Sequence, residues 1–295
     1  MTTSPVFVAG KGLSETDAMQ RMLGEAAERD ALLMRQGDAD RPLMDAHGHS
    51  SGRICARRVL HCGAPGDLGS TGCSAHTQMR QAILNAVCEL IERQAVLRWW
   101  QGDIPARPLT RALGQCSDVS AYLDGARDGA PLVRRTWLFR LEQPGLVHVV
   151  AACSTAPDGD QTAVAFAAGP ALVATAKRAL LELLSVELET ADLAFARQQG
   201  HEVARDSARG LIAARQQAFR STHRHLLDPD QDQARPDQVL PAALEQIMAD
   251  CRARGQDILL ADLTRSDIGL PTCRAFFKDD SLQPVFPKGF DLSPV

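Results

Sequence analysis

The sequence has 295 residues, of which 45% are hydrophobic and 23% charged, with a formal net charge of −4. This balance is typical of a globular protein, and it argues against a general nucleic-acid binder, which usually carries a basic surplus. The first residues, MTTSPVFVAGKG, lack the basic and apolar regions of a secretory signal. The longest apolar stretch, 163–176, is interrupted by Gly169-Pro170 and is shorter than the roughly 20 residues of a membrane span. We therefore expect a soluble, cytoplasmic protein that contacts neither nucleic acid nor membrane.

The N-terminal third predicts two long helices. Ser14 is a good N-cap for a helix over 16–35, and a turn-rich stretch, DADRPLMDAHGHSSG, follows it. The alternation in RICARRVLHC (53–62) predicts a strand. A second helix is predicted over 78–100, and we expect the two large apolar side chains at its end, Trp99 and Trp100, to lie in the core.

The rest of the chain alternates strands with helices. The clearest feature is a hairpin of strands 131–142 and 146–155, joined by Gln143-Pro144-Gly145. The other expected elements are a strand at 164–166, helices at 171–198 and 240–254, strands at 257–263 and 268–277, a loop at 221–238 and a proline-containing tail at 282–295. Strict β-α alternation is absent, so we expect an α/β (α+β) fold with mixed or antiparallel sheets, as one domain over 1–295.

One motif occurs twice. GEAAERDALL (24–33) and CELIERQAVL (88–97) share their acidic and basic positions, so that Glu25, Glu28 and Arg29 recur as Glu89, Glu92 and Arg93. Glutamates three residues apart lie on one helix face and repel each other. The second copy lies in a helix that is apolar nearly all round, where unpaired acids are costly. A repeated pair therefore favours a cation between the carboxylates.

The third long helix has the same character, because Arg178 and Glu182 share one face of a segment rich in Ala and Leu. Carboxylates without His or Cys at helical spacing favour Mg²⁺, and neighbouring arginines fit phosphate. From the residues alone, a Mg-nucleotide site and a set of structural ion pairs both remain open.

Four segments together resemble the YcaO family. They are GKGLSETDAMQRMLGEAAER (10–29), STGCSAHTQMRQAILNAVCELIERQAVLRWW (70–100), RALLELL (178–184) and DLTRSDIGLPTCR (262–274). The resemblance implies ATP and Mg²⁺ as cofactors. It implies Glu25, Glu28, Glu89, Glu92 and Glu182 as Mg²⁺ ligands, and Lys11, Arg93, Arg178 and Ser74 as nucleotide-binding residues. Arg29 would serve either the phosphates or the helix. Two positions depart from the family pattern: Arg21 replaces a small hydroxyl residue, and Ser185 replaces a glutamine.

The function that the resemblance implies is phosphorylation of peptide backbone amides, with formation of thiazoline or oxazoline rings from Cys, Ser or Thr. The alternatives are formation of a thioamide or amidine by an external nucleophile, and an inactive scaffold subunit. The implied partners are a precursor peptide, a protein that binds its leader, an FMN-dependent azoline dehydrogenase and a second copy of the chain in a homodimer.

Overall fold

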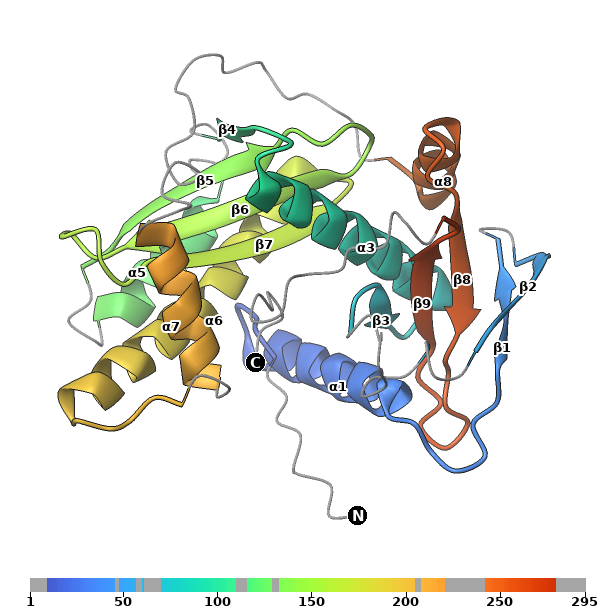
Figure 1. Cartoon of the computed structure of the whole chain (residues 1–295), viewed down its shortest axis with the longest axis horizontal. Coiled ribbons are helices and arrows are strands. Elements are labelled where there is room, and N and C mark those ends of the chain that lie inside the picture. The colour runs from blue at the N-terminus through green and yellow to red at the C-terminus, as the bar shows by residue number, and fades with distance from the viewer. Residues whose placement is uncertain are drawn as a thin grey trace. The chain divides into compact units, whose positions relative to one another are not determined.

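The computed structural model describes residues 10–45, 48–56, 60, 70–109, 116–128, 133–204, 208–220 and 242–279 (Figure 1). The chain divides into two compact units, Met1–Leu90 with Leu244–Gln283 and Ile91–Ala243 with Pro284–Val295. We call these the first and the second unit and describe each by itself. The single domain expected over 1–295 stays a prediction.

The first unit is built on a five-stranded antiparallel sheet in the order β2-β1-β8-β9-β3. Its strands are β1 (Arg41–Met44), β2 (Ser50–Cys55), β3 (Cys73–Ala75), β8 (Ile258–Asp262) and β9 (Thr272–Phe277). Its helices are α1 (Glu15–Leu32) and α8 (Leu244–Ala253). The longer α3 (Met79–Gln101) begins in this unit and continues into the second.

Helix α1 begins where its sequence predicts. The Ser14 hydroxyl accepts a hydrogen bond from the Asp17 N–H at 3.2 Å, and acidic residues in the first turn suit the positive end of the helix dipole. At the other end, Ala31 and Leu32 are buried in a core that includes Leu259 and Phe276. The C-terminal end of α1 therefore packs against side chains of β8 and β9.

The second unit contains a four-stranded antiparallel sheet in the order β4-β5-β6-β7. Its strands are β4 (Ala106–Pro108), β5 (Arg135–Leu141), β6 (His148–Thr155) and β7 (Ala163–Gly169). Its helices are α5 (Ser117–Asp128), α6 (Leu172–Gln198) and α7 (Ala208–Arg220). Helix α6 lies along β6 and β7, as Figure 1 shows.

Both faces of this second sheet are covered, so β6 is buried almost throughout. Leu138, Val150 and Ala165 belong to the core cluster shared with α5 and α6. Side chains at the alternate positions of the strands point to the opposite face. There Trp99 packs against Phe139 and Phe166, and the centroid of each phenylalanine ring lies 5.6 Å from the centroid of the Trp99 ring.

A buried ion network joins α5, α6 and the strands of the second unit. Arg127 donates to both carboxylate oxygens of Glu187, at 2.6 and 3.1 Å, and Ser154 donates to the same carboxylate at 2.5 Å. Arg134 lies 3.4 Å from it and donates to the Gln161 carbonyl at 2.5 Å. The side chains of Glu187, Arg134 and Arg127 are only 2%, 1% and 9% exposed.

The predicted α+β fold with antiparallel sheets is confirmed, and so are the hairpin β5–β6 and the long helices α1, α3 and α6. The stretch 38–52, predicted to be turns, instead contains β1 and the start of β2. Between the two strands, the Asp45 N–H donates to the His49 carbonyl at 2.9 Å. The strand predicted at 53–62 lies partly outside the described residues, and the predicted loop 221–238 and tail 282–295 lie wholly outside them.

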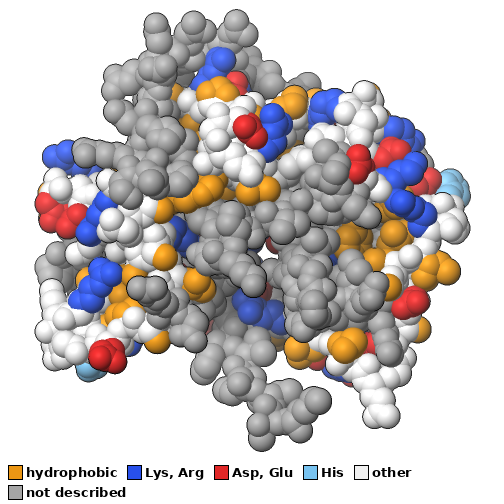
Figure 2. Space-filling view, in the orientation of Figure 1, with side chains coloured by type: hydrophobic (Ala, Val, Ile, Leu, Met, Phe, Trp, Pro, Cys, Tyr) orange, Lys and Arg blue, Asp and Glu red, His pale blue; other side chains and the backbone are white. Residues whose placement is uncertain are grey.

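Within the described ranges, no helix is long and apolar enough to cross a membrane. Figure 2 shows one face on which the basic and acidic side chains of the described residues are interspersed with hydrophobic ones.

Replacing Gly72 with alanine should destabilise the first unit by about 2 kcal/mol. Gly72 has a φ of +70°, and an added Cβ would lie 2.5 Å from the carbonyl oxygen of Ala275 on β9. The strand cannot retreat freely, because the Ala275 N–H donates to the Gly72 carbonyl at 2.7 Å. Urea unfolding followed by far-UV circular dichroism measures the loss.

Gly255 is the matched control, since its φ is +74° and an added Cβ meets no described atom within 4 Å. Gly255→Ala should cost only the backbone strain, about 1 kcal/mol. Equal losses in the two variants would contradict a role for the close approach to β9.

Candidate nucleotide and metal site

The first group of candidate residues lies on α1, β3 and the start of α3, all in the first unit. Glu28 on α1 accepts a hydrogen bond from the Ala75 N–H at 2.7 Å, and the Ser74 hydroxyl also donates to it. Glu89 of α3 lies close enough for its charge to act on Glu28. We call Glu25, Glu28 and Glu89 the first carboxylate cluster.

Electrostatics make this cluster a place for a cation. Burial raises the pKa of Glu28 to about 8, and repulsion from Glu89 and Glu25 contributes in the same direction. The hydrogen bonds from Ala75 and Ser74 oppose this rise in pKa without cancelling it. A carboxyl that resists ionisation beside other carboxylates becomes an anion readily once a positive charge is bound.

The structure gives Arg29 and Ser74 definite partners in the first unit. Arg29 Nε donates to Glu25 at 2.6 Å, so in this structure Arg29 pairs along its own helix. Ser74 is buried in β3, where it donates to Glu28. Both residues therefore form hydrogen bonds to carboxylates of α1 in this structure.

Arg274 is a charged residue of this region that the sequence analysis did not single out. It is fully buried on β9, directly opposite Cys73 of β3. The pKa of the Cys73 thiol is raised, first by burial and then by Glu28, whereas Arg274 opposes the rise. The guanidinium donates to the Leu60 carbonyl at 2.7 Å and lies over the Phe276 ring. A buried arginine in an otherwise apolar strand, TCRAFF, was the available signal.

The second group lies in the second unit and joins the later part of α3 to α6. Burial raises the pKa of the Glu92 carboxyl, and the charge of Glu182 adds to this effect. Arg93 and Arg178 lower it, as does a backbone hydrogen bond from Ala168. We call Glu92 and Glu182 the second carboxylate cluster, with Arg93 and Arg178 as its cations.

Two of these side chains are tied to the framework of the second unit. Arg178 donates to the Ala168 carbonyl at 3.1 Å, so it is anchored to the end of β7. Arg93 is buried on α3. Within the second unit, the charges of Arg93, Arg178 and Glu182 all act on the Glu92 carboxyl. The roles of these residues as ligands of a metal or a nucleotide stay a prediction.

Three other residues, Lys11, Arg21 and His76, lie on or just before α1 and α3. Lys11 precedes α1, next to Gly10, where an added Cβ would lie 1.7 Å from the Ala18 carbonyl oxygen; only glycine allows this approach. Arg21 is exposed and pairs with Asp17 at 3.0 Å along α1. His76 accepts a hydrogen bond from the Gln78 N–H at 3.1 Å, immediately before α3.

The donor set fits Mg²⁺ better than a softer metal. Within the described residues, no three His, Cys, Asp or Glu side chains are grouped so that they could together hold a metal ion. Mg²⁺ usually retains several waters and takes one or two carboxylates with phosphate oxygens, so it does not require such a group. Pairs of glutamates beside arginines satisfy that requirement.

These features define an α+β protein whose long helices carry glutamates and arginines in two clusters, one in each unit. The chain belongs to the YcaO family: the family model, described as YcaO cyclodehydratase, ATP- and Mg²⁺-binding, matches residues 67–277. The resemblance drawn from the sequence is thereby confirmed, and ATP and Mg²⁺ are the cofactors of the family to which this chain belongs.

Solved structures share the fold. A heterocyclase in complex with substrate and cofactor has a TM-score of 0.70 and 17% identity over 90% of this chain, which spans only 43% of that heterocyclase. YcaO from Methanopyrus kandleri, bound with AMPPCP and Mg²⁺, has a TM-score of 0.67 and 18% identity over 95% of this chain and 82% of its own. A chain of the E. coli microcin synthetase McbBCD complex has a TM-score of 0.62 and 12% identity over 90% of this chain and 80% of its own length. No curated protein matches the sequence.

Proposed function

We propose that this protein uses ATP and Mg²⁺ to activate backbone amides of a peptide by phosphorylation, forming thiazoline or oxazoline rings from Cys, Ser or Thr. The observation that carries the proposal is the occurrence, in a YcaO chain, of two glutamate clusters in which burial, with repulsion from a neighbouring glutamate, raises the pKa of one carboxyl, Glu28 in the first and Glu92 in the second. Both clusters lie on helices that also carry arginine.

In the proposed reaction the side-chain thiol or hydroxyl adds to the carbon of the preceding amide, and the amide oxygen accepts the γ-phosphoryl group of ATP. The amide nitrogen then forms a double bond to that carbon and expels phosphate. The N–H and the S–H or O–H lose their protons. The products are ADP, phosphate and a peptide that has lost one water. Phosphorylation matters because an amide oxygen is otherwise a poor leaving group.

The residues of the chain have separate roles in this proposal. The Mg²⁺ ligands would be Glu25, Glu28, Glu89, Glu92 and Glu182, with one or two carboxylates to an ion, and the bound Mg²⁺ would neutralise phosphate oxygens. The phosphate-binding cations would be Lys11, Arg93 and Arg178, with Ser74 beside the nucleotide. Fixed guanidinium groups stabilise the charge of a transferring phosphoryl group without reorganisation. Support comes from the Methanopyrus kandleri neighbour, which is bound with AMPPCP and Mg²⁺.

We also propose partners. A precursor peptide would be the substrate, and a separate protein would hold its leader. An FMN-dependent azoline dehydrogenase and a second copy of this chain complete the proposed assembly. The heterocyclase bound to substrate and the microcin synthetase complex, which resemble this chain in fold, support a peptide substrate and an assembly of subunits.

Calorimetric titration of ATP tests the nucleotide site. The wild type should bind ATP at least about tenfold more tightly with Mg²⁺ than without it, and a Glu89→Gln/Glu92→Gln variant should lose that increment. Glu245→Gln is the matched control, because Glu245 is an exposed glutamate that pairs with Arg80. Absence of ATP binding by the folded wild type, with Mg²⁺ and the leader-binding partner present, would overturn the proposal.

The mass of the product peptide tests the reaction. Ring formation removes one water from the peptide, whereas thioamide formation exchanges oxygen for sulfur. A folded protein that binds Mg-ATP but leaves its cognate peptide unchanged in mass would indicate a scaffold.

A further inference from the structure

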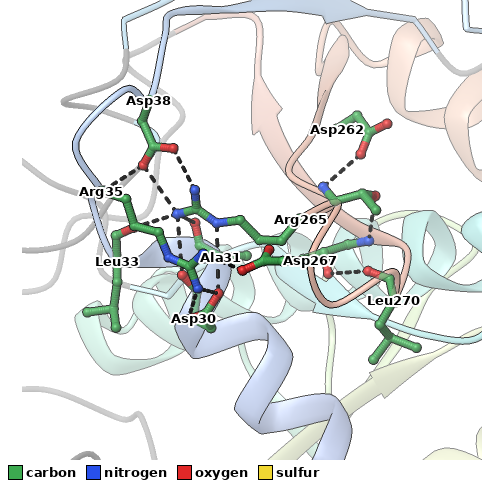
Figure 3. A network of polar contacts seen from close by, with 11 residues as sticks. Asp30, Ala31, Leu33, Arg35, Asp38, Asp262, Arg265, Asp267 and Leu270 are labelled. Carbon is green, nitrogen blue, oxygen red and sulfur yellow. Dashed lines mark hydrogen bonds and ion pairs between the residues drawn. The ribbon is translucent and has the colours of Figure 1, made fainter.

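Arg265 lies in the loop between β8 and β9 and reaches the end of α1 (Figure 3). Its Nη2 group donates to the Leu33 carbonyl at 2.6 Å, with longer contacts to the carbonyls of Asp30 and Ala31 at 3.4 and 3.5 Å. The last carbonyls of a helix have no partner within the helix, and a cation there also complements the helix dipole. Arg265 therefore caps α1 from another part of the chain.

The guanidinium of Arg265 is held in place by Asp38. Nη1 lies 2.5 Å from one carboxylate oxygen and Nη2 lies 3.2 Å from the other, so the pair has fork geometry. Both side chains are only 10% exposed. Asp38 also accepts from the Arg35 N–H at 2.7 Å, which fixes the segment that leaves α1. Figure 3 shows this arrangement, with Arg265 between Asp38 and the helix end.

Three further side chains, those of Arg35, Asp30 and Asp267, lie beside this cap and are more exposed to solvent. Arg35 contacts both oxygens of Asp30 at 2.5 and 2.6 Å and donates to Asp267 at 2.8 Å. Asp267 belongs to the same loop as Arg265, but its side chain is 60% exposed, and its hydrogen bond is to Arg35. It therefore offers a comparison within one loop.

The loop that carries Arg265 leads directly into β9, and β9 pairs with β3. In that pairing Thr272 lies opposite Ala75, whose N–H donates to Glu28 at 2.7 Å. Glu28 lies one helical turn before Leu32, the last residue of α1. The segment from Arg265 to the end of β9 therefore has two contacts that matter for Glu28. Arg265 holds the end of α1, and β9 pairs with β3, which carries the Ala75 N–H that donates to Glu28.

We propose that Arg265 is a positioning residue for the first carboxylate cluster. By capping α1, Arg265 fixes the rotation of the helix about its axis and its position along that axis, so that Glu28 accepts a hydrogen bond from the Ala75 N–H. This inference rests on the proposed function only for its consequence, which is tighter binding of Mg-ATP. The geometric part, Glu28 held against β3, has its own readout.

The test follows exchange of single backbone amides by NMR in the full chain. The Ala75 N–H donates to Glu28, whereas the next amide, that of His76, donates to the Pro271 carbonyl at 3.0 Å. In an Arg265→Lys variant, which keeps the charge beside Asp38 but loses the planar fork, Ala75 exchange should accelerate about tenfold. Exchange at His76 should stay within about twofold of wild type.

Two further variants keep the result interpretable. Arg265→Gln with Asp38→Asn removes both charges, so that no carboxylate is left buried and unpaired, and it should also accelerate exchange at Ala75. Asp267→Asn, in the same loop, should leave both amides unchanged. Unchanged exchange at Ala75 in the Arg265 variants would overturn the proposal. Equal acceleration at both amides would also overturn it, because Arg265 would then only stabilise the β3–β9 pair.

Calorimetry on the same variants separates this inference from the proposed function. Mg-ATP should bind about tenfold more weakly to Arg265→Lys and with wild-type affinity to Asp267→Asn. A wild type that binds no Mg-ATP would contradict the proposed function while leaving the exchange result to decide the role of Arg265. Wild-type affinity in Arg265→Lys, despite faster exchange at Ala75, would contradict the link between the cap and the metal site.

Discussion

Replacing Glu187 with alanine should lower the free energy of unfolding of the second unit by about 3–5 kcal/mol, the largest effect on stability that we expect from a single change. The carboxylate is 2% exposed and lies against two guanidinium groups, those of Arg127 and Arg134. Burial lowers the pKa of Arg134, and Glu187 is the group that chiefly opposes this shift. Without Glu187, two positive charges would remain in an interior that cannot hydrate them.

The natural fluorescence of the protein makes this measurement selective. The three tryptophans, Trp99, Trp100 and Trp137, all lie in the second unit, so fluorescence during urea unfolding follows that unit. Asp192→Ala on the same helix is the matched control, since the pair of Asp192 and Arg209 is exposed at the surface. It should cost less than about 1 kcal/mol. A loss of that small size for Glu187→Ala would show that the network contributes little.

Replacing Glu28 with glutamine should remove much of the pH dependence of stability of the metal-free protein. The pKa of Glu28 is raised from 4.5 to about 8, so between these values the folded state holds a proton that the unfolded state has released. Stability therefore falls as the pH rises through this window, by an amount on the order of 5 kcal/mol. Glutamine does not titrate, so the variant should be more stable than wild type near pH 8.

Mg²⁺ should reverse this order of stability near pH 8. The ion binds the ionised carboxylate and displaces the proton, so saturating Mg²⁺ with ATP should raise the melting temperature of the wild type and not that of Glu28→Gln. Thermal unfolding at several pH values between about 5 and 9, with and without Mg-ATP, measures both effects. Glu245→Gln should behave as wild type. Parallel stability curves for wild type and Glu28→Gln would contradict the raised pKa.

The long helices and the β5–β6 hairpin could be predicted because their signals are local. Ser14 marks the start of α1, and the turn at Gln143-Pro144-Gly145 sets the pairing of β5 with β6. The charge of Glu89 on α3 acts on Glu28 of α1, so the two copies of the repeated motif each place a glutamate in this cluster, and the predicted binding of a cation there stays a prediction. Helix α7 was missed although its pattern was present, with Ile212, Gln216 and Phe219 buried at helical spacing.

Other features could not be predicted because their causes are not local. Strand β3 has three residues, too few for a period, and is a strand only because β9 lies beside it. Strand β1 contains Pro42, which argues against a strand by its own preference. The partners of Arg265 and Glu187 lie far along the chain, so the sequence gives no indication that one caps a helix or that the other joins two arginines.

The position of β3 at the end of its sheet has a consequence for aggregation. An edge strand with unpaired N–H groups is a template on which another chain can form a strand. In β3 the N–H of Cys73 donates to the Ser70 carbonyl at 3.1 Å and the N–H of Ala75 to Glu28 at 2.7 Å, so both donors are occupied by the chain itself. Glu28 is therefore a candidate metal ligand that also occupies a backbone donor of an edge strand. Removing the Glu28 carboxylate would leave the Ala75 N–H of this edge strand without its acceptor.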